Sequence, residues 1–486
     1  MILDDFLHLM PLLILVAASL IIMLVIAVQR YHKLIYIITL VSLIAAFASL
    51  FELRNTEIYH ISPMFVIDRF ALFYIGLILL SSLIVTMLSY AYLEQREERK
   101  EEYYILHILA TLGACVLVIS KHFTGLFLGL EVLSVALYGL IAYMRTRERS
   151  DEAGIKYLIL AAVSSAFLLF GMALIYAATG SMGFYEIGLY LSVSSLHQMP
   201  IILLTGFGLM IVGIGFKLGI VPFHMWTPDV YQGAPAPVTA FIATVSKGGM
   251  VAVLIRFFMQ TDGFRYPSLV IIFTVIAIAS MFAGNILALL QNNVKRILAY
   301  SSIAHLGYLL VAFLAGNALG VEAVTFYLVA YFITSLGAFG IITLLSDEER
   351  DADLMDDYRG LLWRRPWTAA AFTAMLLSLA GIPLTAGFVG KFYLLAAGVR
   401  TELWLLVLML ALNSVVGLYY YLRIVAVMFQ QTNAGRERQL LHPSAYFVSG
   451  ATIAILAILL VYVGVYPTGL MNMIQGLILS IDTSIP

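Results

Sequence analysis

Charged residues and cysteine are scarce in this chain of 486 residues. Asp, Glu, Lys and Arg together make up 11% of it, whereas a soluble domain carries about 25%, so the composition excludes an ordinary soluble protein. The net charge of −1 provides no basic surface for nucleic acid. The single cysteine, Cys115, excludes a disulfide framework and a cysteine-ligated cluster, and we interpret it as a small buried apolar side chain.

Signatures of bound cofactors are also missing. No glycine-rich phosphate loop follows a strand, and no group of His, Cys, Asp and Glu residues has metal-ligand spacing. No pair of histidines has the helix spacing that a bis-histidine haem needs. We therefore expect neither a cofactor nor a metal in this chain.

Apolar residues, in contrast, make up 62% of the chain and form long uninterrupted runs. Each run is long enough to cross the roughly 30 Å hydrocarbon core of a lipid bilayer. The pattern predicts an all-α polytopic membrane protein with about fourteen transmembrane helices. The predicted spans are 10–29, 35–52, 70–93, 103–120, 124–143, 155–178, 199–220, 238–259, 268–290, 297–315, 320–345, 366–398, 402–430 and 445–466.

Cations in the loops predict the orientation of these spans. Loops after odd-numbered spans hold sixteen, namely Arg30, Lys33, Arg96, Arg99, Lys100, Arg145, Arg147, Arg149, Lys295, Arg296, Arg350, Arg359, Arg364, Arg365, Arg436 and Arg438. The opposite side holds six, namely Arg54, Arg69, Lys121, Arg256, Arg265 and Arg400. Because cytoplasmic loops are enriched in Lys and Arg, we expect both termini to be periplasmic, in a bacterial cytoplasmic (inner) membrane.

Two spans contain residues that break a helix. Pro222 and three further prolines follow the seventh span, and Gly381 and Pro383 interrupt the twelfth. Broken helices in corresponding halves of a membrane protein indicate a transport site. Pro222 and Pro383 occupy corresponding places, which predicts a five-helix unit used twice, with the second copy inverted. The alternative is two unrelated proline kinks.

The predicted repeats divide the chain into four parts. Residues 1–102 hold helices 1–3, residues 103–259 the first repeat, residues 268–430 the second, inverted repeat, and residues 431–486 helix 14 and an interfacial tail. The segment 346–365 is rich in charge, and we interpret it as a solvated cytoplasmic connection. Residues 182–196 are too short and mixed to span, so we place them at the outer interface.

Five basic residues lie inside apolar runs, namely Lys156, Lys217, Lys247, Lys391 and Arg423, and one acid, Glu131, lies at a similar depth. A charge at the centre of a bilayer helix costs about 2.5–3.5 kcal/mol on insertion scales. Such a repeated cost is unusual for a passive anchor and favours a protein that moves protons.

The surroundings of these residues suggest different roles. Glu131 stays charged only beside a cation, and Lys217 is the best candidate for a pair with it; the alternatives are a static ion pair, or Lys217 as a cap of its helix end. Lys247 is followed by Gly248 and Gly249, which we expect to leave room for water beside a proton carrier.

The remaining ionisable residues give weaker signals. Lys156 lies at the cytoplasmic start of its helix, from which it can also reach water. Arg423 cannot release a proton, so we expect an anchor or counter-charge. Neutral imidazole can pass a proton, which makes His224 and His305 possible relays; each could equally be a hydrogen-bonded core histidine.

Three long motifs resemble one known family. The stretches GFKLGIVPFHMWTPDVYQGAPAPVTAF, NNVKRILAYSSIAHLGYLLVA and SLAGIPLTAGFVGKFYLL resemble the antiporter-like subunits of respiratory complex I, a family shared with multisubunit cation/proton antiporters. The resemblance extends over essentially the whole chain and is strongest to the N-type members. M-type members have a glutamate in place of Lys391, and L-type members carry a longer C-terminal lateral helix.

The resemblance implies a mechanism and partners. Matched motif by motif, it makes Glu131, Lys156, Lys217, Lys247 and Lys391 the proton-translocating residues of a central row of water and ionisable groups. It implies NADH oxidation and quinone reduction in other membrane-arm and peripheral-arm subunits, which would hold FMN, iron–sulfur clusters and the quinone. The alternatives are a subunit of a multisubunit sodium(cation)/proton antiporter, and a structural or quinone-binding membrane subunit that pumps nothing.

Overall fold

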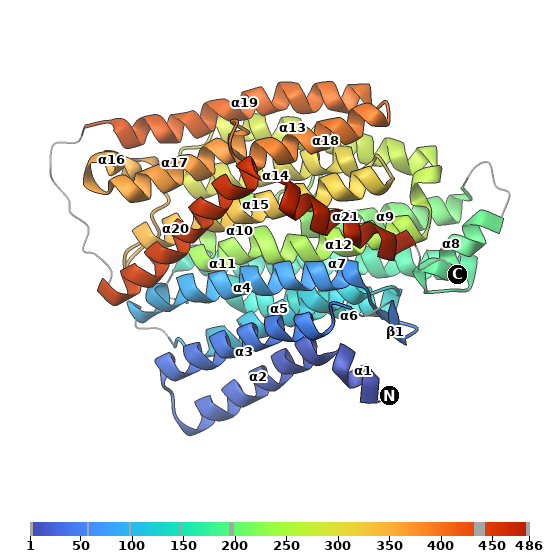
Figure 1. The fold of residues 1–486 in the computed structure, drawn as a ribbon, viewed down its shortest axis with the longest axis horizontal. Coiled ribbons are helices and arrows are strands. Elements are labelled where there is room, and N and C mark those ends of the chain that lie inside the picture. The colour runs from blue at the N-terminus through green and yellow to red at the C-terminus, as the bar shows by residue number, and fades with distance from the viewer. Residues whose placement is uncertain are drawn as a thin grey trace.

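The computed structural model describes residues 3–55, 58–96, 99–145, 147–193, 199–431 and 443–482, which are almost entirely helical (Figure 1). Its N-terminal part consists of α1 (Leu3–His8), α2 (Met10–Val28), α3 (His32–Glu52), the antiparallel strands β1 (Tyr59–Ser62) and β2 (Phe65–Ile67), and α4 (Arg69–Glu94). Of the loop cations, Arg436 and Arg438 lie outside the described residues.

The middle of the chain contains α5 (Glu102–Ile119), α6 (Phe123–Ile141), α7 (Glu148–Thr179), α8 (Phe184–Val193), α9 (Ile201–Leu218) and α10 (Trp226–Gly233). It continues with one long helix made of α11 (Ala236–Phe241), the π-helical turn η1 (Ile242–Ser246) and α12 (Lys247–Gln260). The ten-residue α8 is too short to cross a membrane, as the sequence predicts.

The last part begins with the 3₁₀ turn η2 (Gly263–Arg265), α13 (Pro267–Leu289), α14 (Val294–Phe313) and α15 (Ala318–Leu345). After the 3₁₀ turn η3 (Met355–Tyr358) and the short α16 (Leu361–Arg364) come α17 (Pro366–Ala380), α18 (Ala386–Arg400), α19 (Trp404–Phe429), α20 (Pro443–Val465) and α21 (Thr468–Asp482).

The predicted all-α polytopic membrane fold is confirmed. Among the described residues, thirteen helices are long and apolar enough to cross a membrane, and Pro366–Ala380 forms a shorter apolar helix. That shorter helix is α17, the first half of the predicted span 366–398, which the chain builds from α17 and α18. The fourteen predicted spans therefore correspond to helices at the predicted places.

Both predicted helix breaks begin with a glycine in the left-handed conformation. Gly219 has φ 73° and ends α9, and Gly381 has φ 88° and ends α17. In each case the next residue, Ile220 or Ile382, donates its N–H at 3.0 Å to a carbonyl five residues back, as in the common glycine-ended helix. The matching ends support the predicted repeat of residues 103–259 and 268–430, which stays a prediction.

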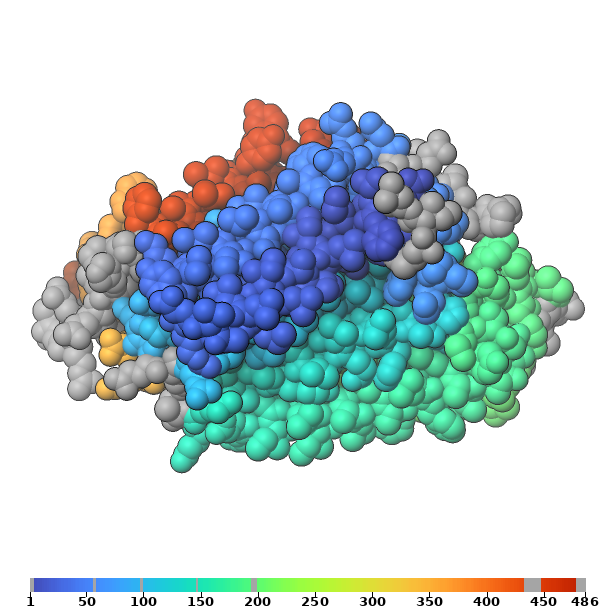
Figure 2. Space-filling model, turned by 90° about the horizontal axis from the view of Figure 1, so that it is seen from below, coloured from blue at the N-terminus to red at the C-terminus, as the bar shows by residue number. Residues whose placement is uncertain are grey.

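The helices differ strongly in burial. The helix from Ala236 to Gln260 is completely enclosed, and α14 and α15 are nearly so, whereas α2, α3, α19 and α20 lie at the periphery. Figure 2 shows one such face, on which the blue N-terminal helices lie against the cyan and green helices α5–α7. Exposed Leu24, Phe170 and Val415 leave the peripheral helices an apolar outer surface suited to lipid.

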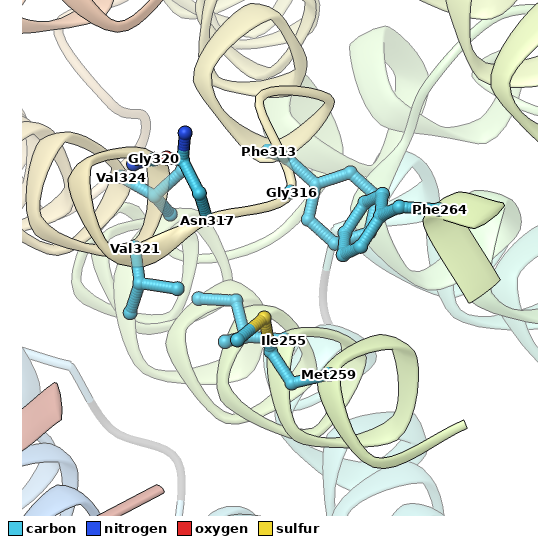
Figure 3. A pocket seen from close by; sticks show the side chains of 9 residues that line it. All are labelled: Ile255, Met259, Phe264, Phe313, Gly316, Asn317, Gly320, Val321 and Val324. Atoms are coloured by element: carbon cyan, nitrogen blue, oxygen red, sulfur yellow. Dashed lines mark hydrogen bonds between the residues drawn. The ribbon is translucent and has the colours of Figure 1, made fainter. Parts of the chain in front are cut away.

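The end of the molecule near η2 is closed by tight aromatic packing. Phe264 and Phe313 stack edge to face at 5.0 Å between ring centroids, and Ile255 and Val321 lie beside them (Figure 3). The gap that remains measures about 10 Å³, which is close to the minimum for a single water. This gap is therefore too small for any molecule larger than water.

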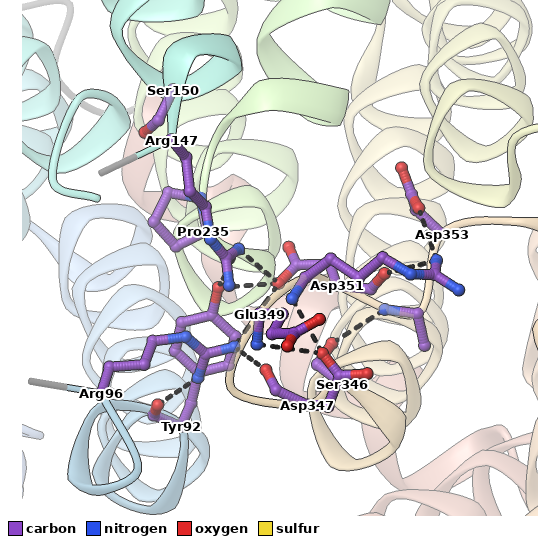
Figure 4. A network of polar contacts seen from close by, with 12 residues as sticks. Tyr92, Arg96, Arg147, Ser150, Pro235, Ser346, Asp347, Glu349, Asp351 and Asp353 are labelled. Carbon is purple, nitrogen blue, oxygen red and sulfur yellow. Dashed lines mark hydrogen bonds and ion pairs between the residues drawn. The ribbon is translucent and has the colours of Figure 1, made fainter. Parts of the chain in front are cut away.

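The charged segment 346–365 is only partly the solvated connection that the sequence predicts, because its middle is buried. Asp351 and Asp353 are buried, and Ala352 and Tyr358 are fully enclosed. Asp351 accepts from Arg147 at 3.1 Å and from Tyr92 at 2.7 Å (Figure 4). It also accepts from Lys295 at 2.9 Å. This part of the segment is folded inward because two cations, Lys295 and Arg147, need a carboxylate away from water.

Two further loop assignments are wrong for the same reason. Lys295 is fully buried, and it also donates to the carbonyl of Ala234 at 2.6 Å. Arg256 is fully buried and forms two parallel hydrogen bonds with Asp68, at 2.6 and 3.0 Å. Each cation lies near a helix end, where its position in the sequence resembles a loop, but a carboxylate from a distant segment encloses it.

Candidate functional site

Three of the predicted lysines lie in the interior. Lys217, Lys247 and Lys391 are 2%, 0% and 6% exposed, and they come from α9, α12 and α18. Each Nζ donates to a serine hydroxyl, which belongs to Ser134 at 2.6 Å, to Ser302, and to Ser414 at 2.8 Å, respectively. A hydroxyl can accept from an ammonium group and can donate to a neutral amine, so this contact serves both protonation states of lysine.

Lys217 occupies the last turn of α9, directly before the left-handed Gly219. Its Nζ lies 3.3 Å from the hydroxyl of Tyr157 and 5.1 Å from the centroid of that ring. The indole of Trp226 donates to the carbonyl of Phe216 at 2.8 Å, so one of the free carbonyls of this helix end is satisfied from beyond the break. The break thus places the lysine beside α6 and α7.

Glu131 lies near Lys217 without touching it. Its carboxylate accepts from Ser165 of α7 at 2.6 Å, and Ser134, which binds Lys217, follows Glu131 by one turn on the same helix. Of the ion pairs among the described residues, none joins Glu131 to Lys217. The predicted direct pair is absent from this structure because separate serines bind the two groups.

Lys156 lies apart from the buried lysines, at a polar opening of the surface. Its side chain is 42% exposed and pairs with Glu152 at 2.6 Å and with Asp229 at 2.8 Å. Asp229 also pairs with Arg296 at 2.7 Å. Around this cluster lies a polar cavity of about 90 Å³, also lined by Gln232. The predicted snorkelling of Lys156 to water agrees with this exposure.

Lys247 is the first residue of α12 and directly follows the π-helical turn η1, a feature that often marks functional positions. Gly248 and Gly249 are closely packed, and the room for water that we expect beside Lys247 stays a prediction. A Cβ on Gly248 would lie 2.5 Å from the ring of Phe332, and one on Gly249 would lie 3.0 Å from a backbone oxygen of Ala114. The glycines admit close packing of α15 and α5.

His305 connects the surroundings of Lys247 with those of Lys391. Its Nε2 lies 3.0 Å from the hydroxyl of Tyr421, and its Nδ1 lies 2.6 Å from that of Tyr327. On the same helix α14, Ser302 contacts Lys247, and the ring of Tyr308 lies 5.2 Å from the Nζ of Lys391. One face of α14 therefore carries polar groups from one lysine towards the other.

Lys391 folds back over the second helix break. Its Nζ donates to the carbonyl of Ala380, the last residue of α17, at 2.8 Å. Lys217 and Lys391 thus both lie at the C-terminal end of a half-helix, where the helix dipole favours a cation. Lys217 belongs to its half-helix, whereas Lys391 comes from the segment after the break, so the two are only loose counterparts.

His224 and Arg423 lie away from this row. His224 lies in the turn between α9 and α10, is 8% exposed, and its Nδ1 has no hydrogen-bond partner among the described residues. No described hydrogen bond joins it to a buried lysine, so its relay role stays a prediction. Arg423 donates to the carbonyl of Gln291 at 3.0 Å and also contacts Asn292, which agrees with the predicted anchor.

Several polar partners of the lysines were not predicted from the sequence. The lysines are bound by Ser134, Tyr157, Ser302 and Ser414, and His305 is bound by Tyr327 and Tyr421. On α14 the sequence does contain a signal for a polar face, because Ser302, His305 and Tyr308 follow one another at three-residue intervals. A single sequence does not reveal the partners on the other helices.

Comparisons with known proteins agree with this arrangement. Residues 120–417 match the family described as NADH:quinone oxidoreductase/Mrp antiporter, TM. The chain is 47% identical over 480 residues to NADH-quinone oxidoreductase subunit N of Ectopseudomonas mendocina, covering 96% of this chain and 95% of that one.

Solved structures share the fold. A chain of respiratory complex I from Thermus thermophilus has a TM-score of 0.80 and 31% identity, with 95% of this chain and 98% of that one covered. An archaeal membrane-bound sulfane sulfur reductase has a TM-score of 0.86 and 24% identity over 99% of each chain. The Mrp complex of a Dietzia species has a TM-score of 0.85 and 21% identity, with 98% of this chain and 97% of that one covered. The likenesses to the reductase and to the Mrp complex concern the fold alone.

The family match covers more than half of the chain, and the identity to subunit N extends over nearly all of it. The chain therefore belongs to the NADH:quinone oxidoreductase/Mrp antiporter transmembrane family, and within it to the antiporter-like N subunits of respiratory complex I.

Proposed function

We propose that this chain moves protons across the membrane as a membrane-arm subunit of a proton-pumping NADH:quinone oxidoreductase. The observation that carries the proposal is the row of buried lysines with hydroxyl partners inside a chain that is 47% identical to subunit N. The chain contributes to a translocase reaction, and the redox chemistry belongs to other subunits.

The proton path that we propose starts at the polar cavity around Lys156 and Asp229, which reaches the surface. Lys217 and Lys247 then bind protons in the interior, and the hydroxyl of Ser302 and the ring of His305 connect Lys247 towards Lys391. Because hydroxyl groups and imidazole both donate and accept, a proton can move along them, with water joining the wider gaps.

In this mechanism Glu131 controls Lys217. The two side chains bind serines of neighbouring helices, and Ser134 is one turn from Glu131. A small movement of α6 relative to α7 changes their separation and thereby the stability of a proton on Lys217. The sites are close enough to titrate as a coupled set.

Partners and surroundings follow from the same proposal. NADH oxidation and quinone reduction take place in the other membrane-arm and peripheral-arm subunits, where FMN, the iron–sulfur clusters and the quinone bind. The chain lies in a bacterial cytoplasmic (inner) membrane. Both termini face the periplasm, because the cations of the odd-numbered loops exceed those of the other side.

Two other functions compete with this one. An Mrp-type cation/proton antiporter shares the fold, but that likeness rests on 21% identity, against 47% to subunit N. A purely structural or quinone-binding subunit would have no use for three buried lysines, each of which is costly to bury.

The test begins with purification of the tagged chain in mild detergent, followed by assays of NADH:quinone activity and of proton uptake in proteoliposomes. Lys247→Met is compared with Lys33→Met, because Lys33 is an exposed residue in the first turn of α3. We expect Lys247→Met to reduce proton uptake by about ten-fold or more, as for a lost acid–base group, and Lys33→Met to leave it unchanged.

Two other outcomes would contradict the proposed function. Recovery of the chain in an assembly that exchanges sodium for protons without NADH oxidation would favour the antiporter. Normal proton uptake in Lys247→Met would favour a structural subunit and would remove Lys247 from the path.

A further inference from the structure

A large apolar groove runs beside the peripheral helix α3, away from the row of lysines. It has a volume of about 670 Å³ and is lined from α3, α4, α15 and α21. The lining side chains are mainly leucines and phenylalanines, such as Leu50, Phe73 and Leu477. The C-terminal α21 packs across α4 and α15 and so forms one wall of the groove (Figure 1).

One end of the groove is cationic. Arg54 follows α3 and Arg69 begins α4, and both line the groove together with Asn55. Both arginine side chains are exposed, and neither forms an ion pair with a described carboxylate. Two guanidinium groups that no described carboxylate neutralises, beside an amide, make a site for a phosphate group.

The apolar part extends from this end into the membrane-spanning region. Leu80 lines the groove eleven residues after Arg69 on α4, which corresponds to about 16 Å along a helix. A polar group at one end and an apolar channel along a transmembrane helix match the two parts of a phospholipid.

From this combination we infer that the groove binds an anionic diacyl glycerophospholipid, with its phosphate on Arg54 and Arg69 and an acyl chain along α4. A transmembrane helix of a partner subunit fits less well. Such a helix is about 10 Å wide and 30 Å long, which is several times the volume of the groove. A zwitterionic lipid would leave the two positive charges less well balanced.

The experiment uses the whole assembly that contains this chain, reconstituted in nanodiscs of phosphatidylcholine with 20% or so phosphatidylglycerol, a composition that gives the membrane a modest negative charge. A photoactivatable phosphatidylglycerol is crosslinked, and the labelled peptides are identified by mass spectrometry. We expect labelling of residues 47–54 and 69–80. Because each cation near the surface contributes about 1 kcal/mol to the binding of anionic lipid, Arg54→Gln with Arg69→Gln should reduce labelling about thirty-fold.

Two further variants distinguish lipid binding in the groove from general attraction of lipid to surface charge. Arg265→Gln with Arg400→Gln removes two other exposed arginines and should leave the labelling unchanged. Gly76→Phe keeps both groove arginines but fills the space next to Leu50 and Phe47, which a Cβ on Gly76 would meet at 3.5 and 3.6 Å, and should reduce labelling.

Equal labelling by a phosphatidylcholine probe would overturn the choice of an anionic lipid. Labelling that both arginine pairs reduce alike would show attraction to the membrane surface only. Crosslinks from the groove to another subunit, with no lipid label, would assign the groove to a protein partner and overturn the inference. All of these outcomes are independent of proton transport, so they leave the proposed function untouched.

Discussion

At the scale of single residues, the position of Lys391 distinguishes a proton carrier from a fixed cap. Its Nζ binds the last carbonyl of α17 and the hydroxyl of Ser414, and an arginine could also bind a helix end. Because a guanidinium group does not release its proton, we expect Lys391→Arg to lose NADH-driven proton uptake as fully as Lys391→Met, by about ten-fold or more.

Lys156→Arg is the matched comparison. Lys156 is 42% exposed and already bound to two carboxylates, which a guanidinium group can bind equally well. We expect this variant to keep most of its proton uptake. Activity that survives in Lys391→Arg would mean that Lys391 only stabilises the helix end.

The hydroxyl partner of Lys247 provides a second test at this scale. Ser302→Ala removes that hydroxyl with little change of shape, which corresponds to the loss of about 1–1.5 kcal/mol for one hydrogen bond and hence to roughly ten-fold slower proton transfer. Ser81→Ala is the control, because Ser81 is also buried and donates only to the carbonyl of Leu77 within its own helix. Equal rates in the two variants would exclude Ser302 from the path.

At the scale of helices, the second break depends on the left-handed Gly381. An alanine there costs about 1–2 kcal/mol of backbone strain, and its Cβ would lie 2.9 Å from Cδ of Lys391. Gly180 has a similar φ of 71° with nothing within 4 Å, so Gly180→Ala measures the strain alone. We expect both variants to melt earlier in detergent, and only Gly381→Ala to transport protons more slowly as well.

The same helices show what could be predicted from the sequence. The spans and both breaks were predicted correctly, because the length of an apolar run and the position of Pro or Gly act locally. The partners of Lys217 could not be predicted, because Ser134 and Tyr157 lie on other helices, and only packing decides which helices touch. The predicted pairing of Glu131 with Lys217 is not a direct contact in this structure, because Ser165 and Ser134 bind the two groups separately.

At the scale of the whole molecule, Asp351 joins three parts of the chain. Arg96 comes from the end of α4 and Arg147 from the start of α7 (Figure 4). Lys295 comes from α14. Loss of one partner from a buried ion pair costs about 3–5 kcal/mol, so Asp351→Asn should lower the melting temperature of the assembly by several degrees. Asp356→Asn is the control, because the Asp356 side chain is 79% exposed and should have almost no effect.

Acid should remove the difference in melting temperature between wild type and Asp351→Asn. Burial by itself raises the pKa of Asp351, but Lys295, Arg147 and Arg96 outweigh it and hold that pKa well below its usual range. A lowered pKa contributes stability that is complete above the ordinary aspartate value of about 3.9 and is lost as the pH falls below it. The difference in melting temperature between wild type and Asp351→Asn should therefore stay constant from about pH 8 to 5 and shrink at lower pH.

The burial of Asp351 could not be predicted from the sequence, and neither could that of Arg256 and Lys295. A run of acids and arginines predicts a hydrated loop, and Arg256 and Lys295 also look like loop charges. In each case the compensating group comes from more than 50 residues away, as with Asp68 for Arg256. Local composition carries no information about such distant partners.

The serine contacts of the buried lysines also affect how charge moves through the protein. No described carboxylate pairs with Lys247 or Lys391, which are bound by hydroxyl and carbonyl oxygens alone. These two lysines therefore have no paired negative charge to neutralise a second proton, and a proton on one of them repels a proton on the other. A proton can therefore enter one site only after the proton on the next site has left.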